Sequence, residues 1–248
     1  MNTMYQFAVS HYCEKARWAM DLKGQSYQIK NLLPGPHAKK MHKLANDTSV
    51  PVVAFQNTVI QGSDKIIDYL DETCPDSTLT PVNPEDAKQA REWEQYAAHH
   101  IGDPIRCLLY HELLEHKDLL ISVLTHNAPW YGKHLYRFIY NDLKKRIRQG
   151  MKINDRTASI ARKTLTLAFD KLDEELRGKS YLVGNTFSRA DLSVAAMSAP
   201  LVWPANSWFI WTENIPESIN QFRAPFTQRS TFHWVNEIYQ NHRKPVAS

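Results

Sequence analysis

A polar segment with three prolines, PDSTLTPVNPED at residues 75–86, divides this chain into two parts with different hydrophobic patterns. Before this segment, short apolar runs typical of strands alternate with helical patterns. After it, apolar residues recur at helical spacing and no alternating run follows. The sequence therefore predicts an α/β domain over residues 1–76, a linker over residues 77–84 and an all-helical domain over residues 85–248.

The first part is expected to contain strands and helices in the order β-α-β-α-β-β-α. The strands are predicted at residues 4–9, 27–32, 50–55 and 58–61, with Gln56-Asn57 as a tight hairpin between the last two. The helices are predicted at residues 13–23, after Pro36, and from a capping Ser63 to the residue before Pro75. A β-α-β unit followed by a β-β-α unit can form one mixed sheet with helices on both faces.

The second part reads as a helical bundle. Apolar residues recur at helical spacing from Ala87 to Ile101 and from Ile160 to Leu176. Farther along, Ser188 and Asp191 have the spacing of a capping box, in which each side chain bonds the other residue's backbone N–H. A length of 248 residues is enough to give both parts a buried core.

Charge and cysteine usage exclude several classes of function. The net charge is only +4, from 30 basic and 26 acidic residues, and the densest basic run, Lys144–Arg148, is expected to be a solvated helix face. Neither nucleic acid nor an anionic membrane is therefore predicted as a partner. The three cysteines are widely spaced, which predicts neither a disulfide framework nor a metal site. They are typical of a reducing compartment.

The sequence also shows neither a secretory signal nor a membrane-spanning segment. The N-terminus lacks the basic flank and long apolar core of a secretory signal. No segment approaches the ~18 uninterrupted apolar residues that a membrane span requires. The sequence predicts a soluble, cytoplasmic protein.

The stretch Ser10-His11-Tyr12-Cys13 stands where the first strand gives way to the first helix. It has the spacing of a Cys-x-x-Cys redox motif, but its first cysteine is replaced by serine. Ser10 alone could be no more than a helix N-cap. Cys13 would lie one turn into the helix, where packing is a better explanation than chemistry.

Taken together, four features make the chain similar to the soluble glutathione transferases, in particular the theta, zeta and bacterial branches. They are Ser10-x-x-Cys13 at the first strand-to-helix turn, Val50-Pro51 at the third strand, Gly62-Ser63 before the third helix, and GNTFSRADLSVAA at residues 184–196. The order and spacing of the four make the combination specific. The resemblance implies a thioredoxin-like first domain, a helical second domain and a homodimer.

The resemblance also implies roles for individual residues. It places a cis peptide bond at Val50-Pro51, so that the Val50 backbone can pair with the extended cysteinyl part of glutathione. Gly62 and Ser63 would meet the γ-glutamyl end, since a helix N-terminus is a suitable carboxylate site. His37 would meet the glycyl carboxylate. If the resemblance is set aside, Pro51 is expected to follow an ordinary trans peptide bond, and Ser63 is expected only to cap its helix.

Ser10 would be the catalytic residue, because a glutathione thiol needs activation. Only a few per cent of a thiol with a pKa of ~8.5 is ionised at neutral pH. Lowering that pKa to ~6.5 requires a differential interaction of ~2.7 kcal/mol. A hydrogen bond from the hydroxyl and the helix dipole can supply this interaction energy. The protein would then activate the thiol of glutathione and not a thiol of its own.

The chain departs from the family pattern at two places. Gly62 stands where an acidic or amide residue usually precedes the turn serine, with Asp64 after it. His37 alone matches the usual Lys or His pair before the second helix, although Lys39 and Lys40 lie close by. His37 could equally be a solvated loop residue.

Other positions near the first turn have ordinary explanations as well as functional ones. His11 and Tyr12 flank the proposed sulfur site and could touch an electrophile, although exposed turn residues are the default. Tyr5 is one residue off the position where other branches use a tyrosine, and is expected in the core. Residues 200–211 are unusually aromatic, which fits core or dimer packing better than a substrate wall.

These observations predict a cytoplasmic glutathione transferase that attacks a small electrophile, with glutathione as co-substrate and no metal. Two rivals remain. One is a glutathione-dependent thiol-disulfide oxidoreductase that uses Cys13. The other is a transferase-like binding or stress protein without catalysis, which Gly62 favours and an intact Ser10 opposes.

Overall fold

The first domain is built on a four-stranded mixed sheet, seen in a computed structural model that describes residues 1–208, 211 and 215–244. The strand order is β2-β1-β3-β4. β1 (Asn2–Gln6) pairs in parallel with β2 (Tyr27–Asn31) and antiparallel with β3 (Val52–Ala54). β3 in turn pairs antiparallel with β4 (Val59–Gln61). The mixed sheet is the one predicted from the sequence.

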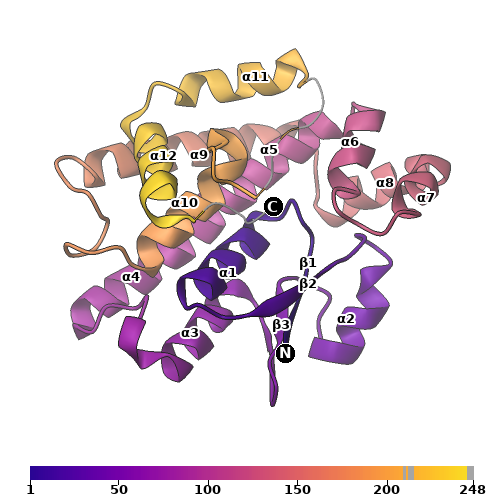
Figure 1. The fold of residues 1–248 in the computed structure, drawn as a ribbon. Helices are drawn as coiled ribbons and strands as arrows, with labels where there is room; N and C mark the ends of the chain where they lie inside the picture. The colour runs from indigo at the N-terminus through magenta and orange to yellow at the C-terminus, as the bar shows by residue number, and fades with distance from the viewer. Residues whose placement is uncertain (209–210, 212–214, 245–248) are drawn as a thin grey trace.

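Three helices cover this sheet in the predicted chain order. They are α1 (His11–Leu22), α2 (His37–Ala45) and α3 (Ser63–Thr73). Helices α1 and α3 pack together on the side toward the second domain, and α2 lies on the opposite side (Figure 1). The buried side chains between α1, α3 and the sheet include Met4, Ala16, Ile66 and Leu70.

Several boundaries differ from the sequence prediction. β1 ends at Gln6 because the chain turns there, with the Ser10 N–H donating to Phe7 O at 3.1 Å. Helix α1 therefore begins at His11, two residues earlier than predicted. The predicted hairpin is confirmed, since Phe55 N–H donates to Thr58 O at 2.8 Å across Gln56-Asn57.

Beyond Gln61, the described residues form only helices, turns and loops. The helices and helical turns in chain order are η1 (Pro75–Ser77), α4 (Pro84–Tyr96), the π-helical turn η2 (Ala97–Gly102), α5 (Asp103–Leu113), α6 (Lys117–Leu124), α7 (Gly132–Phe138), α8 (Tyr140–Gly150), α9 (Asp155–Glu175), α10 (Arg189–Val202), α11 (Glu217–Arg223), η3 (Ala224–Phe226) and α12 (Ser230–His242). Helix α10 is buried along almost its whole length and contacts α1, α4 and α12.

The capping box that starts α10 is present as predicted. The Asp191 carboxylate accepts the Ser188 N–H at 2.9 Å and the Leu182 N–H at 2.8 Å, and the Ser188 hydroxyl accepts the Ala190 N–H. Burial raises the pKa of Asp191 to about 6. The box ties the start of the central helix to the loop before it.

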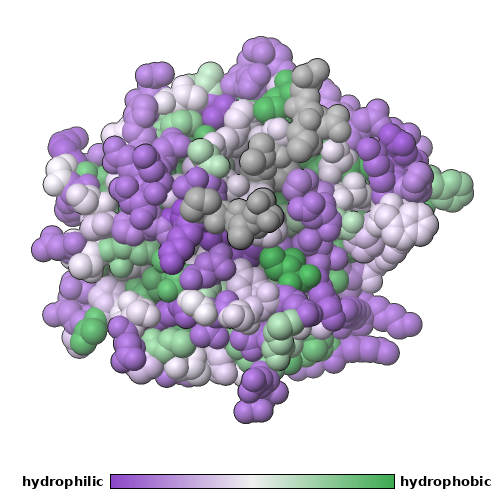
Figure 2. All heavy atoms as spheres, in the orientation of Figure 1, coloured by the Kyte–Doolittle hydropathy of each residue, from purple (hydrophilic) through white to green (hydrophobic). Residues whose placement is uncertain are grey.

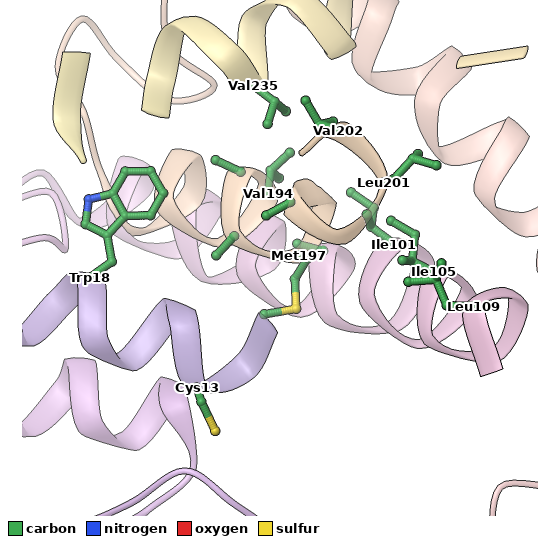
Figure 3. Close-up of a cluster of buried hydrophobic side chains, with 14 of the residues drawn as sticks. Cys13, Trp18, Ile101, Ile105, Leu109, Val194, Met197, Leu201, Val202 and Val235 are labelled. Carbon is green, nitrogen blue, oxygen red and sulfur yellow. The ribbon is translucent and has the colours of Figure 1, made fainter. Parts of the chain in front are cut away.

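Helix α1 makes buried contacts with the second domain. Figure 3 shows Trp18 on α1 pointing toward the helical domain, where Val194 and Met197 of α10 lie, while Cys13 points away from α10. The Trp18 indole N–H donates to His242 O at 3.0 Å, at the end of α12. The end of α12 is therefore held against α1.

The face of the molecule shown in Figure 2 is dominated by hydrophilic side chains, with scattered hydrophobic ones. Among the helices in the described ranges, none is long and apolar enough to cross a lipid bilayer.

Candidate functional site

Two adjoining cavities lie between the domains. One, which we call the polar cavity, has a volume of about 540 Å³ and is lined by residues of α1, α3, α4 and the β3 start. The other, the apolar cavity, has a volume of about 340 Å³ and is lined mainly by apolar residues of both domains. Tyr12, Ser49, Val50 and Arg106 line both. The cavities therefore meet at the start of α1 and beside Val50.

The predicted site residues are divided between these cavities. Ser10, His11, Tyr12 and His37 line the apolar cavity. Pro51, Gly62 and Ser63 line the polar cavity, and Val50 lines both. The structure thus brings together residues that lie more than fifty positions apart in the chain.

Ser10 is the N-cap of α1. Its backbone is extended, and its Oγ accepts the Cys13 N–H at 3.3 Å. The prediction that Ser10 is a helix N-cap is therefore confirmed. The residue also lies in the wall of the apolar cavity. Its hydroxyl is near the unpaired N–H groups of the first helical turn, where negative charge is stabilised.

Cys13 is completely buried. Burial raises the pKa of its thiol, although Arg17 and the Ser10 hydroxyl work in the opposite direction. A buried cysteine that stays protonated is a poor nucleophile. This burial agrees with the packing role predicted for Cys13 and opposes the oxidoreductase rival.

The start of β3 has the geometry that the resemblance implies. The Val50–Pro51 peptide bond is cis. Pro51 O accepts the Gly62 N–H at 3.0 Å, which joins the β3 start to the start of α3. Val50 and Ser63 consequently face the same polar cavity.

Ser63 does not cap α3, contrary to the prediction. Gly62 occupies the cap position with φ of 100°, a conformation that residues with a Cβ rarely adopt, and Ser63 is the first helical residue. The Asp64 carboxylate folds back over Gly62, with Oδ1 only 2.8 Å from where a Cβ would stand. An acidic oxygen therefore lies beside Gly62, although the residue at position 62 itself has no side chain.

His37 does not offer a free imidazole to the polar cavity. Its ring packs edge-on against Phe7 at 4.7 Å, and its Nε2 contacts Thr48 O at 3.0 Å. Burial lowers the pKa of His37. Lys39 and Lys40, considered as substitutes, line neither cavity among the described residues.

Tyr5 is half-exposed, so the expectation that it lies in the core is wrong. The Lys40 ammonium lies over its ring at 4.6 Å from the centroid. The reason is strand alternation, which sends Met4 and Gln6 to the buried side of the sheet and Tyr5 to the other side.

A buried ion cluster forms one wall of the polar cavity. Glu94 on α4 pairs with both Lys15 of α1 and Arg189 of α10. Arg189 also donates to Asp68 of α3 at 2.6 Å and to Thr80 at 2.9 Å. The cluster therefore joins both domains directly at the candidate site.

Sequence reasoning missed Arg106, which lines both cavities. It lies on α5 and donates to Asp103 Oδ1 at 2.9 Å, and the Tyr12 hydroxyl donates to the same oxygen at 3.1 Å. The signal available was the spacing of Arg106, Leu109, Tyr110 and Leu113, which lie on one helical face. All four line the apolar cavity.

The aromatic segment at residues 200–211 both packs internally and lines a cavity. Phe209 and Ile210 of this segment lie outside the described residues. Trp203 packs against Trp211 with ring centroids 5.7 Å apart, and Arg17 lies over Trp208 at 4.5 Å. Pro200 and Trp211 also line the apolar cavity. The segment therefore contributes to the wall of the apolar cavity as well as to packing.

Comparison with known proteins supports the same interpretation. Residues 4–78 match the glutathione S-transferase N-terminal domain family, and residues 136–201 match the glutathione S-transferase C-terminal domain family. A "probable maleylacetoacetate isomerase" from Caenorhabditis elegans is 27% identical over 205 residues, which cover 82% of this chain and 78% of that protein.

Two solved structures show the shared fold. The beta-etherase LigF from Sphingobium sp. strain SYK-6 is 16% identical, with a TM-score of 0.63, and the match covers 97% of this chain and 99% of that one. A theta class glutathione S-transferase from Xanthomonas axonopodis pv. citri, with glutathione bound, is 15% identical with a TM-score of 0.58, over 100% and 99% of the two chains. Because the two domain families match in the predicted order and the architecture agrees, the chain belongs to the glutathione S-transferase superfamily of enzymes.

Proposed function

We propose that this protein is a glutathione transferase in which Ser10 stabilises the thiolate of bound glutathione for attack on a small electrophile. The observation that carries the proposal is the position of Ser10. It caps α1 in the wall of the apolar cavity, beside the place where that cavity meets the polar one. A thiol lying at this junction would have the electrophile cavity on its other side.

Glutathione would lie along the polar cavity. Its cysteinyl backbone would pair with the Val50 backbone, as an extended peptide adds to a strand. Its γ-glutamyl carboxylate would meet Ser63 and the unpaired N–H groups at the start of α3. The Asp64 carboxylate, folded over Gly62, is in a suitable place for the γ-glutamyl ammonium.

The Ser10 hydroxyl would donate to the sulfur. In the free protein its neighbour is the Cys13 thiol, whose pKa is raised by burial, and a neutral thiol is a weak acceptor. A glutathione thiolate is a much stronger one, so the hydroxyl would turn to it when glutathione binds. The thiol of glutathione is then activated without a cysteine of the protein.

The finer assignments belong to the same proposal. A homodimer, a cytoplasmic location and a role in detoxification follow from the superfamily resemblance, and sedimentation analysis tests the first of them. The oxidoreductase rival is disfavoured by the burial of Cys13. The non-catalytic rival predicts no turnover of any electrophile.

Calorimetry with glutathione, followed by conjugation of chlorodinitrobenzene, tests the proposal. We expect binding at millimolar glutathione or below. Ser63→Ala should weaken binding by about 1–2 kcal/mol, the cost of losing a charge-assisted hydrogen bond. The exposed Ser159→Ala, far along the chain on α9, is the matched control. No binding by the wild type at millimolar glutathione would overturn the proposal.

A further inference from the structure

Helix α7 and the turn before it expose three large aromatic side chains within nine residues. Trp130 is 84% exposed, Tyr131 is 47% exposed and Phe138 is 90% exposed. The rings of Trp130 and Tyr131 pack edge-on, with their centroids 6.0 Å apart. A single exposed aromatic residue needs no explanation, whereas several together indicate contact with another surface. We call these three residues the aromatic cluster.

The packing of α7 explains why these rings face solvent. Gly132 and Tyr136, four residues apart on one side of the helix, are buried. A Cβ at Gly132 would lie 2.6 Å from Leu33 Cδ2, and the Tyr136 hydroxyl donates to Pro34 O. One side of α7 is therefore fixed to the loop before α2. The exposed residues of α7 and its N-cap lie away from that contact, and they are Tyr131, Lys133, His134, Arg137 and Phe138.

Positive charge is concentrated in two segments that lie on the same side of the molecule. Residues 24–46 and 117–152 together contain 12 Lys and Arg but only two acidic residues, Asp118 and Asp142. The rest of the chain contains 18 basic and 24 acidic residues. The first segment includes α2 and the second includes α6, α7 and α8, which Figure 1 shows together on one side. The net charge of +4 therefore conceals a basic side of the molecule and an acidic remainder.

Cations lie close to the aromatic cluster in the sequence and on neighbouring elements. Lys133 and Arg137 are exposed on α7, and Lys145 and Arg146 are exposed on α8, which contacts α7. In the part of the chain that the structure describes, Lys133, Lys145 and Arg146 form no ion pair, and Arg137 approaches only Asp118, at 3.9 Å. These charges are not neutralised within the protein, so they can attract an anionic surface.

Helix α2 extends the basic side. Lys39, Lys40 and Lys43 are exposed on this helix, and Lys30 is exposed at the neighbouring β2. The Lys30 and Lys40 ammonium groups both lie over the ring of Tyr5, at 5.8 and 4.6 Å from its centroid. At physiological salt, charges act over about 8 Å, so cations that do not touch an anionic surface still contribute to its attraction.

We propose that this protein docks on the surface of an anionic lipid bilayer through the aromatic cluster, with the cations of α7, α8 and α2 facing the headgroups. Trp and Tyr favour the level of the headgroups, where one end of the ring is apolar and the other is wet. Neighbouring Lys and Arg add attraction to anionic lipids. The chain would lie on the membrane without crossing it. This proposal departs from the expectation based on net charge, because net charge does not show how charges are distributed.

The shape of the surface favours a bilayer over a nucleic acid. A single strand binds in a basic groove, where aromatic rings stack on successive bases. Trp130, Phe138, Lys133 and Arg137 line neither the polar nor the apolar cavity. In Figure 2, a hydrophobic side chain projects from the edge of the molecule where Figure 1 places α7. Rings that project from a convex surface can enter the headgroup layer of a flat, fluid bilayer.

Flotation of the full chain with lipid vesicles tests the proposal, and glutathione is left out because the docking does not depend on it. One set of vesicles contains phosphatidylcholine alone, and the other also contains phosphatidylserine. We expect the partition coefficient to be at least about 10-fold higher with phosphatidylserine. The difference should shrink as salt is added, because salt screens the attraction.

Two double variants separate the apolar and the charged contributions. Trp130→Ser with Phe138→Ser should weaken binding to the phosphatidylserine vesicles about 10- to 100-fold, because it removes the apolar area that enters the bilayer. Lys133→Gln with Arg137→Gln should weaken it about 10-fold and reduce its dependence on salt. Val82→Ser and Lys163→Gln are the matched controls, since both residues are exposed and lie outside the two basic segments. They should bind as the wild type does.

Fluorescence quenching tests whether a ring enters the bilayer. Vesicles with brominated acyl chains should quench part of the tryptophan emission of the wild type, and Trp130→Phe should abolish that part although six tryptophans remain. Quenching that persists unchanged in Trp130→Phe would overturn the proposal.

Three other results would also overturn it. The first is a wild type that does not bind phosphatidylserine vesicles at low salt, and the second is equal binding by Trp130→Ser with Phe138→Ser. The third is a different occupant of this surface. Tighter binding of a single-stranded oligonucleotide than of these vesicles, lost in the same variants, would assign the surface to nucleic acid. A smaller sedimentation coefficient in the Trp130→Ser and Phe138→Ser variant would assign it to a second copy of the chain.

Discussion

Ser10 and Cys13 lie at the two ends of one helical turn, but burial gives them different chemistry. Ser10 faces a cavity and accepts one backbone N–H, whereas Cys13 is completely buried and its thiol pKa is raised. The hydroxyl can therefore meet a ligand and the thiol cannot. In the proposed mechanism, the serine that replaces the first cysteine of the Cys-x-x-Cys spacing would donate to the thiol of bound glutathione.

Replacing Ser10 by alanine tests this directly. We expect Ser10→Ala to lower kcat by about 10- to 1000-fold, as for removal of one donor to a developing anion. Glutathione affinity should change little, because the hydroxyl favours the thiolate over the thiol. Steady-state kinetics and calorimetry measure the two effects.

The same substitution removes a helix cap, which costs about 1 kcal/mol of stability. Thermal unfolding of Ser10→Ala therefore accompanies the kinetics, with the exposed Ser26→Ala as a control. If Ser10→Ala conjugates as fast as the wild type, Ser10 is a cap only and another group activates the thiol.

Ser10→Cys should change the type of reaction. A cysteine at the start of α1 acquires a depressed pKa from the helix N-terminus and can attack disulfides. We expect this variant to lose conjugation and to gain exchange with glutathione mixed disulfides. The double variant with Cys13→Ala should keep the exchange, since Cys13 is buried. Disulfide reduction by the wild type that Cys13→Ser abolishes would favour the oxidoreductase rival instead.

At the level of elements, the linker between the domains is fixed by one carboxylate. Asp71 on α3 accepts the Leu79 and Thr80 N–H groups at 2.8 and 2.9 Å and the Lys23 ammonium at 2.7 Å. Lys23 also donates to Ser77 O at 2.5 Å. The start of the predicted linker is consequently held against α1 and α3 at Ser77, Leu79 and Thr80.

Asp71→Asn should lower the free energy of unfolding by about 1–3 kcal/mol at neutral pH, because it removes a charge-assisted acceptor. Burial would raise the pKa of Asp71, but the hydrogen bonds from Lys23, Thr80 and Leu79 outweigh it and hold the pKa below its ordinary value. A depressed carboxyl pKa contributes stability above the unfolded value of about 3.9, and this contribution is lost as the pH falls through the folded value. The difference between wild type and variant should therefore shrink below about pH 4. Urea unfolding at several pH values measures it, and a difference that stays constant down to pH 2 would contradict this account.

Across the whole molecule, the domains are joined by the buried cluster of Glu94, Lys15 and Arg189. Glu94→Gln would leave two buried cations with less compensation, so we expect a loss of about 3–5 kcal/mol in unfolding free energy. Glu115→Gln is the matched control, since Glu115 also pairs with two cations but is 58% exposed. That control should cost less than about 1 kcal/mol. Equal losses in the two variants would show that burial is not what makes the cluster important.

The sequence by itself determined the order of the elements, the mixed sheet and the helical second part. These follow from hydrophobic period and from turn and cap residues, which are local properties. The residues around Ser10, Val50 and Ser63 were also found this way, with the help of a family resemblance. The prediction of a cap at Ser63 was wrong because the left-handed Gly62 takes that position.

Only the tertiary structure decided which distant groups share a cavity. In the sequence, Arg106 is an ordinary cation on an amphipathic helix. It joins the candidate site only because the start of α5 lies next to the start of α1, where the Tyr12 hydroxyl donates to Asp103. A Cβ at Gly102, directly before α5, would lie 2.7 Å from Met197 Sδ and 3.1 Å from His11 Nε2, so a larger residue there would force these side chains to move. Likewise, the hydrogen bonds to Asp71 decided that the linker is ordered at Leu79 and Thr80. Such contacts join residues far apart in the chain, so no local pattern records them.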